Sequence, residues 1–309
     1  MVAPTTLTYD WTQAMQTEAL NQVQRWRNWS DAFVLHPADT PLGVTPREVV
    51  WKRGKMHLYR YQAQTEHVHP VPYLLVPWLG ISRPYVLDLM PGQSMVEFLV
   101  QRGYDVYMLD WGVIAEEDGY LGLEELVLKI LPRAIDRMLE LSRAEQITLN
   151  GLCLGGVITL TYLALHPEAP VKNVVAIVTP VDFEHGGLFK SWIGHPSFPA
   201  ELMVQRFGGV PPALMGMGFK MLRPTNDLAA LAGLWFNLDR TEYIPTYKAM
   251  YRWANDFVAM PGRFFRQLTR ELYNRNTLIQ GTLTVGGQRV DLRQIHQPQD
   301  EESRLSARR

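Results

Sequence analysis

"LNGLCLGGVITL" occupies residues 149–160, and this stretch decides the fold. The strand-like residues 147–150 lead into the pattern Gly-x-Cys-x-Gly, and an apolar, helix-like run begins at Val157. A strand that turns sharply into a helix, with a nucleophile at the turn, is a nucleophile elbow, here with sulfur in place of the usual serine oxygen. The pattern therefore predicts that Cys153 stands above a parallel sheet, at the start of a helix.

Two physical features of this turn favour a reactive thiol. Gly151 and Gly155 have no side chains, so the strand and the helix can approach closely. The N-terminus of the helix points its free N–H groups and positive dipole end at the sulfur, and the thiolate is the reactive form of cysteine. The alternative is that Cys153, the only cysteine of the chain, is a small buried side chain without chemistry.

Strand-like and helix-like segments alternate on both sides of this turn. Apolar runs of strand length occupy residues 71–80, 104–112, 146–151 and 171–182, and helical patterns separate them. This alternation is typical of a mainly parallel sheet with helices on both faces. Upstream, residues 12–34 have helical spacing, and residues 47–63 are predicted to form a hairpin.

Residues 183–280 interrupt the alternation, because they are rich in Met, Phe and Trp at helical spacing and contain no strand-like run. They predict a helical insertion over the sheet, which is either a substrate-covering cap or ordinary helical packing. Residues 281–292 are predicted to form a hairpin with Gly286 and Gly287 at its turn. The expected organisation is an N-terminal helical segment (1–47), an α/β core (48–182), a helical cap (183–280), a hairpin remnant of the core (281–298) and a disordered charged tail (299–309).

The composition of the chain excludes several classes of function. The net charge of −1 over 309 residues gives no electrostatic reason to expect a nucleic-acid partner. A single cysteine excludes an internal disulfide and fits a reducing compartment. The N-terminus lacks the pattern of a secretory signal, and no stretch approaches about 18 uninterrupted apolar residues. We therefore expect a cytoplasmic protein without a transmembrane segment, and we assign it no metal or cofactor.

An elbow nucleophile needs an oxyanion hole, which is a pair of N–H groups directed at the oxygen that becomes negative during attack. One donor is expected to be the backbone N–H of Leu154, the residue after the nucleophile. The second is expected in the loop "WLGISRPY" (78–85) after the first core strand, with the peptide N–H of Ile81 as the candidate. The alternative for this loop is a plain strand-to-helix connection.

Five stretches, in the right order, match one family. They are "SRPYVLDL" (82–89), "YDVYMLDWG" (104–112), "GLCLGG" (151–156), "IVTPVDF" (177–183) and "GGQRVDL" (286–292). In these motifs the chain resembles the catalytic subunit of class III polyhydroxyalkanoate synthases from about residue 40 to about residue 298. The resemblance implies an α/β-hydrolase-like fold with a cap domain, in which Cys153 falls on the family nucleophile.

The resemblance also implies an activity and partners. It implies polymerisation of (R)-3-hydroxyacyl-CoA with release of CoA, together with a second, non-catalytic subunit and a location on polyester granules. The residue suits this chemistry, because attack of a thiolate on a thioester yields another thioester of nearly equal energy. The acyl chain then stays activated on Cys153 for the next transfer.

The match ends before the base and acid of the family. They would follow the segment that matches "GGQRVDL", but the chain continues as "QDEESRLSARR" and contains no Gly-Gly-His. We therefore expect a chain that is C-terminally truncated relative to the family, with its last core strands missing and residues 173–178 at an uncovered sheet edge. Among the histidines, only His185 has a suitable position. Asp110 and Asp182 are expected to anchor loops, and His166 is expected to cap a helix.

Three functions stay open at this point. The first is an acyltransferase of polyester synthesis, with the activity of this chain in doubt. The second is a thioesterase or depolymerase on the same fold, which would release free hydroxy acid. The third is a catalytically dead homologue that binds the partner subunit or the granule.

Overall fold

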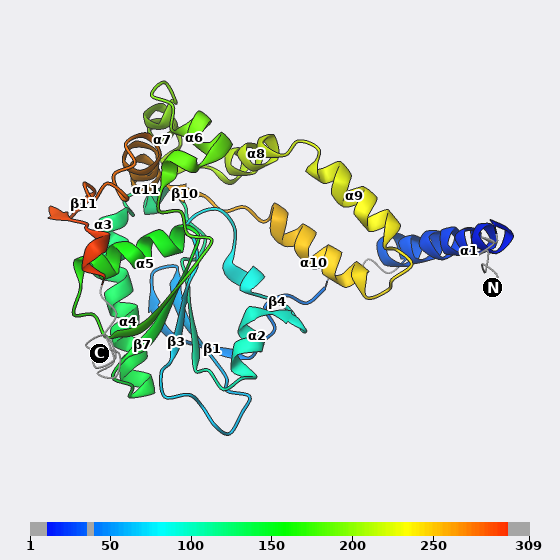
Figure 1. Ribbon diagram of the computed structural model, residues 1–309, viewed down its shortest axis with the longest axis horizontal. Helices are drawn as coiled ribbons and strands as arrows, with labels where there is room; N and C mark the ends of the chain where they lie inside the picture. Colours follow the sequence, from blue (N-terminus) through cyan, green and yellow to red (C-terminus); the bar gives the residue numbers. More distant parts are fainter. Residues whose placement is uncertain (1–10, 36–39, 296–309) are drawn as a thin grey trace, which may run out of the picture.

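A six-stranded sheet forms the centre of the computed structural model, which describes residues 11–35 and 40–295 (Figure 1). In the order in which they lie across the sheet, its strands are β1 (Arg47–Arg53), β2 (Met56–Tyr61), β6 (Val106–Asp110), β3 (Tyr73–Val76), β7 (Ile147–Leu152) and β8 (Val171–Ile177). The last four strands are parallel, while β2 is antiparallel to both β1 and β6. The predicted hairpin and the predicted mainly parallel sheet are therefore both confirmed.

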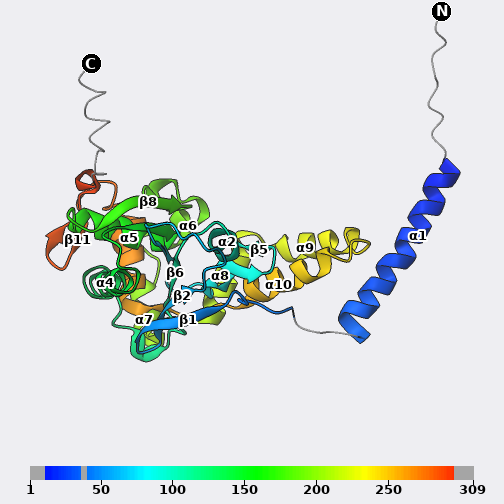
Figure 2. The ribbon, with the colours of Figure 1, turned by 90° about the horizontal axis from the view of Figure 1, so that it is seen from below.

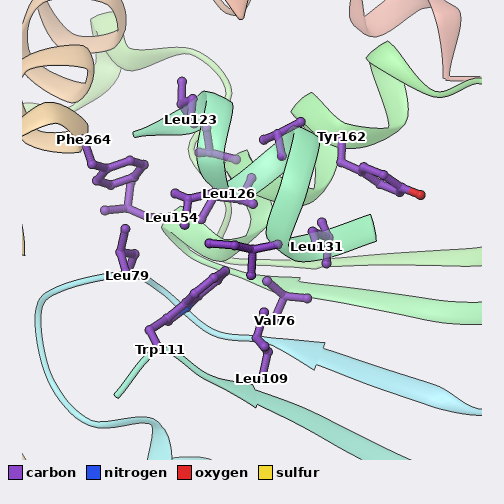
Figure 3. Packing of buried hydrophobic residues seen from close by; sticks show 14 of the residues in the cluster. Val76, Leu79, Leu109, Trp111, Leu123, Leu126, Leu131, Leu154, Tyr162 and Phe264 are labelled. Atoms are coloured by element: carbon purple, nitrogen blue, oxygen red, sulfur yellow. The ribbon is translucent and has the colours of Figure 1, made fainter. Parts of the chain in front are cut away.

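Both faces of the sheet are buried, as alternation along β3 shows. Leu74 and Val76 belong to the apolar cluster under α4 (Leu131–Ser142) and α5 (Leu154–Leu165). Tyr73 and Leu75 belong to the cluster on the other face, which contains residues of α2 (Met95–Val100). Figure 3 shows the first of these clusters, in which Val76 and Leu109 from the sheet lie beneath Leu126, Leu131 and Leu154. This two-sided burial explains why the core strands are continuously apolar.

Short elements connect the strands and helices of the core. They are η2 (Pro84–Leu87), β4 (Asp88–Met90), β5 (Gln93–Ser94), η3 (Glu116–Asp118), α3 (Leu123–Glu125) and η4 (Leu126–Ile130). Helix α2 begins where the Ser94 hydroxyl accepts a hydrogen bond from the Glu97 N–H, which satisfies one of the free donors of the first turn. Helix α4 ends at Arg143, whose φ of 57° breaks the helical geometry.

Residues 183–280 are mainly helical, as the sequence predicts. Their helices are η5 (Phe183–His185), α6 (Gly187–Ile193), α7 (Ala200–Phe207), α8 (Pro212–Leu222), α9 (Asn226–Phe236), α10 (Tyr243–Asn255), α11 (Gly262–Gln267) and η6 (Leu268–Asn274). The expectation that this segment contains no strand is wrong, because β9 (Gly209–Val210) pairs with β10 (Met260–Pro261). A pair of two-residue strands is too short to give an apolar run or an alternation that sequence inspection detects.

The N-terminal helix α1 (Trp11–Ser30), continued by the π-helical turn η1 (Asp31–Leu35), confirms the helix predicted over residues 12–34. It lies beyond α9 and α10, on the side away from the sheet (Figures 1 and 2). Phe33 and Trp235 contact a small buried cluster of Leu234, Leu238 and Ile244, which is separate from the two clusters of the core. Within the described ranges, no helix combines the length and the apolar character needed to cross a bilayer.

The C-terminal part of the described chain contains the predicted hairpin. β11 (Thr284–Val285) pairs with β12 (Gln288–Arg289), and the turn residues Gly286 and Gly287 have φ values of 59° and 80°. The short helix η7 (Leu292–Gln294) follows. As far as residue 295, nothing after β8 joins the main sheet, so β8 is an edge strand of the described sheet, as expected. The tail predicted to be disordered (299–309) lies outside the described residues, and the domain boundaries stay a prediction.

Candidate active site

Cys153 occupies the sharp turn between β7 and α5 that the sequence predicts. Its φ of 52° and ψ of −121° form a backbone conformation that a residue with a side chain rarely adopts, at a cost on the order of 1–3 kcal/mol. The surrounding hydrogen bonds fix it: the Cys153 N–H donates to the Ile177 carbonyl at 2.9 Å, and the Cys153 carbonyl accepts from the N–H of Gly156 at 2.9 Å. Cys153 therefore has the strained geometry expected of a nucleophile at an elbow.

The glycines of the turn allow an unusually close approach of the helix to the sheet. A Cβ on Gly155 would collide with the main-chain carbonyl oxygens of Val76 and Pro77, at the end of β3. A Cβ on Gly156 would collide with the side chain of Thr179, just after β8. The first turn of α5 is thus wedged between the ends of the two strands that flank β7, which brings the loop after β3 next to the elbow.

The environment of the thiol opposes ionisation. Burial raises the pKa of the Cys153 thiol, and a hydrogen bond from the Leu154 N–H only partly counteracts this effect. The expected N–H donor at the helix N-terminus is present. The expectation that it makes the thiolate the favoured form is wrong, because burial raises the pKa more than this donor lowers it. Burial disfavours a charge more strongly than one amide stabilises it. A thiol of this kind reacts when a base removes its proton or when the pH is high.

Tyr273, in η6, is a neighbour of the thiol that sequence inspection missed. Burial, together with the charge of Cys153, raises the pKa of Tyr273 to about 12. The Tyr273 ring packs edge-to-face on Phe183, with 4.9 Å between the ring centroids. Because Tyr273 follows Cys153 by 120 positions and lies on a helix without a distinctive motif, no local signal could have identified it.

The carboxylates near the elbow anchor loops, as expected. Asp110 accepts a hydrogen bond from the Gly112 N–H at 2.8 Å and forms an ion pair with Arg83 at 3.1 Å. Asp182 accepts hydrogen bonds from the Glu184 N–H at 3.0 Å and from the Asn276 side chain at 2.7 Å.

The described histidines do not complete a catalytic pair. The side chain of His185 is 87% exposed, lies 3.8 Å from Asp182 and does not contribute to the pKa of Cys153. His166 ends α5, at the opposite end from Cys153, where its N–H and its ring both interact with the Tyr162 carbonyl; this confirms the predicted cap. His36 and His296 lie outside the described residues. Within those residues, no group of three or more His, Cys, Asp and Glu side chains could hold a metal ion.

The loop that follows β3 carries Ile81, the second predicted donor. β3 and β7 are parallel neighbours, with Val76 opposite Gly151. This loop and the elbow therefore both begin at the carboxyl end of the parallel strands. The Ile81 carbonyl is held at 2.9 Å by the N–H of Val258, from the helical segment. A convergence of the Leu154 and Ile81 N–H groups on one oxygen stays a prediction.

A mainly apolar cavity of about 480 Å³ adjoins this loop on the side of the helical segment. Ile81 and Ser82 form part of its wall. The remaining wall comes from α8, α9 and α10, including Phe219, Tyr251 and Trp253, from the residues between α8 and α9, and from Phe257 after α10. Cys153 is not part of this wall. We call residues 78–85 the oxyanion loop, because they carry the predicted donor Ile81. The cavity is adjacent to this loop and does not itself enclose the thiol.

Comparison with known proteins identifies two family models in the chain. Residues 29–99 match the poly-beta-hydroxybutyrate polymerase (PhaC) N-terminus, and residues 86–259 match the alpha/beta hydrolase fold. The second match and the mainly parallel sheet confirm the predicted α/β-hydrolase-like fold. Among solved structures, a proposed lipase from Sulfolobus solfataricus aligns with a TM-score of 0.48 and 16% identity, over 73% of this chain and 74% of that one.

Curated relatives are named as poly(3-hydroxyalkanoate) polymerase subunits. The relative from a Synechocystis species is 34% identical over 85% of this chain and 71% of its own length. The relative from Haloferax mediterranei is 30% identical over 96% of this chain, which spans 60% of that protein. The relative from Allochromatium vinosum is 32% identical over 83% of this chain and 72% of its own length. The chain therefore belongs to the poly(3-hydroxyalkanoate) polymerase family, a family of acyltransferases.

Proposed function

We propose that the chain transfers the acyl group of an (R)-3-hydroxyacyl-CoA to the sulfur of Cys153, and from there to the hydroxyl end of a growing polyester. Family membership supports the substrate class. The strained turn that presents Cys153 at the N-terminus of α5 is the observation that carries the assignment of the nucleophile. Sulfur suits the task, because the step from CoA thioester to enzyme thioester is nearly neutral in energy and keeps the acyl group activated.

The first step is written with these atoms. The Cys153 thiolate attacks the thioester carbonyl, the carbonyl oxygen becomes negative, and the carbon–sulfur bond to CoA then breaks. CoA leaves as a thiolate and takes a proton from solvent. We assign the stabilisation of the negative oxygen to the N–H groups of Leu154 and Ile81. The Leu154 amide, which already donates to the sulfur, supports the first assignment.

The second step needs a base to activate the hydroxyl group that attacks the enzyme thioester. The pKa of Cys153 is shifted only by burial and by the Leu154 N–H, so no described histidine acts on the thiol. Without such a base among the described residues, we expect Cys153 to be acylated mainly at elevated pH, where its thiol ionises unaided.

The partners of the chain also belong to this proposal. A second, non-catalytic subunit, a polyester granule surface and a cytoplasmic location follow from the family resemblance. Helix α1 supports contact with an apolar partner or surface, because it exposes Trp11, Met15, Leu20, Val23 and Trp26 to solvent. These residues lie within one half of the helix circumference, which gives the helix one apolar side.

The test is a mass measurement on the intact chain after incubation with (R)-3-hydroxybutyryl-CoA at pH 9. We expect one acyl group on the chain, free CoA in equal amount, and no adduct in Cys153→Ala. Release of free hydroxy acid, with catalytic turnover and no adduct, would instead identify a hydrolase. A wild-type chain that yields neither adduct nor CoA, while iodoacetamide still labels Cys153, would identify a catalytically dead homologue and refute the proposal.

A further inference from the structure

Three consecutive carbonyl groups of the loop after β3 accept hydrogen bonds from side chains or from another segment. The Ile81 carbonyl accepts from the Val258 N–H at 2.9 Å. The Ser82 carbonyl accepts from the Trp78 indole N–H at 3.0 Å, and the Arg83 carbonyl accepts from the Trp253 indole N–H at 3.0 Å. A connection between a strand and a helix does not require such bonds, so the loop is held in one conformation by its own Trp78 and by two donors from outside the loop.

Two of these three donors belong to the end of α10 and the residues after it. The same segment makes further contacts with the loop: the Tyr85 hydroxyl donates to Asp256 at 2.9 Å, and Ser82 forms a β-bridge with Phe257. The Trp253 ring also packs edge-to-face on Trp78, with 6.2 Å between the ring centroids. Residues 253–258 therefore form one wall against which the loop is positioned.

Holding these carbonyls also orients the N–H groups of the loop. A peptide unit is planar, so the held Ile81 and Ser82 carbonyls fix the N–H groups of Ser82 and Arg83. The unit after Arg83 contains Pro84 and has no N–H, so the bond from Trp253 restricts the backbone of the loop and reaches the Ile81 N–H only through the intervening residues. Gly80 adds a further constraint, because its φ is 62° and its Cα lies so close to Met260 that a Cβ would collide with the backbone. The N–H of Ile81 follows this glycine, and its direction depends on how the loop is held. Donors that are fixed before the reaction stabilise a developing oxyanion without reorganisation.

We propose that Trp253 is a positioning residue for acyl transfer: its indole N–H holds the oxyanion loop through the Arg83 carbonyl, so that formation of the oxyanion hole depends on docking of α10. This inference rests on the proposed function, because it assumes that the loop serves Cys153. The same contact connects the helical segment to the catalytic centre, since Trp253 is also part of the wall of the adjoining cavity.

The first test compares two reactions of the same thiol in Trp253→Phe, which removes the indole N–H and keeps an aromatic ring. Iodoacetamide alkylation requires a reachable thiolate and no oxyanion hole, whereas acylation by (R)-3-hydroxybutyryl-CoA requires both. We expect acylation to slow by about 10-fold to 100-fold, which is less than the cost of about 10²–10³-fold for removing an oxyanion-hole donor itself. Alkylation should change by less than about twofold. The matched control is Trp235→Phe. Trp235 lies in α9 and its ring packs on Trp26 of α1, away from the loop, so this variant should keep the wild-type rates of acylation and alkylation.

A second readout does not depend on the reaction. Hydrogen exchange of peptides that cover residues 78–86 should be faster in Trp253→Phe than in the wild type, and unchanged in Trp235→Phe. If the wild type is not acylated, the proposed function is wrong, and this exchange measurement still decides whether Trp253 holds the loop. Equal slowing of acylation and alkylation would mean that Trp253 controls access or folding. That result, or unchanged acylation and exchange in Trp253→Phe, would overturn the inference.

Discussion

Replacement of Gly155 by Ala tests whether the elbow depends on close contact between α5 and the end of β3. The new methyl group would overlap the carbonyl oxygens of Val76 and Pro77. Neither atom can move independently, because both are main-chain atoms and Val76 is fully buried in a central strand. The backbone of α5 or of the loop that leads to Ile81 must therefore shift.

The size of the effect follows from two opposing contributions. Overpacking of a rigid site costs about 1–3 kcal/mol, and the main-chain nature of both contacts places this position at the upper end, about 3 kcal/mol. Ala is favoured over Gly within a helix by about 1 kcal/mol. We therefore expect Gly155→Ala to lower the free energy of unfolding by about 2 kcal/mol.

Urea denaturation, followed by far-ultraviolet circular dichroism, measures this difference, and the slope of the transition shows whether the unfolding mechanism has changed. Gly218→Ala is the control, because Gly218 lies within α8 and a Cβ there would meet no atom within 4 Å. The control should be more stable than the wild type by about 0.5–1 kcal/mol. If Gly155→Ala were as stable as Gly218→Ala, the tight fit of the elbow against β3 would be wrong.

Three further predictions concern the thiol, a buried amide and the open sheet edge. Because burial raises the pKa of Cys153, its alkylation rate should keep rising with pH between pH 7 and pH 9; a plateau below pH 8 would contradict this. Asn276→Ala removes the acceptor of the buried Phe183 N–H and places Ala at a φ of 53°. It should therefore lower the free energy of unfolding, measured by urea titration, by about 3 kcal/mol. A loss below about 1 kcal/mol would show that the amide is dispensable. A charge at the exposed Ala176 of β8 should reduce concentration-dependent light scattering if this edge causes self-association; equal scattering by wild type and Ala176→Lys would disprove that role.

The sequence predicts those features whose signal is local. Cys153, its glycines and the flanking strand and helix are consecutive residues, so the elbow can be located without any tertiary information. The apolar strands were equally clear, because burial on both faces removes polar residues from them. β9 and β10 were missed because each has only two residues and their pairing joins positions 50 residues apart.

The missed parts of the site depend on tertiary contacts. Tyr273 and Trp253 approach the elbow and its loop from the helical segment, and nothing in their own neighbourhood in the sequence indicates it. The pKa of Cys153 was misjudged for a related reason. The N-terminus of a helix can be read from the sequence, whereas the extent of burial around the sulfur depends on side chains from several elements.

The small cluster around Leu234, Leu238 and Ile244 marks a part of the molecule that can unfold locally. Its contacts come from η1, α9 and α10, and it shares no buried residue with the clusters that cover the sheet. Cooperative unfolding follows buried contacts, so this outlying unit can open without melting the sheet. A protease should cut this unit first and leave a resistant fragment that contains the elbow. A partner that binds α1 would stabilise the same unit against local unfolding.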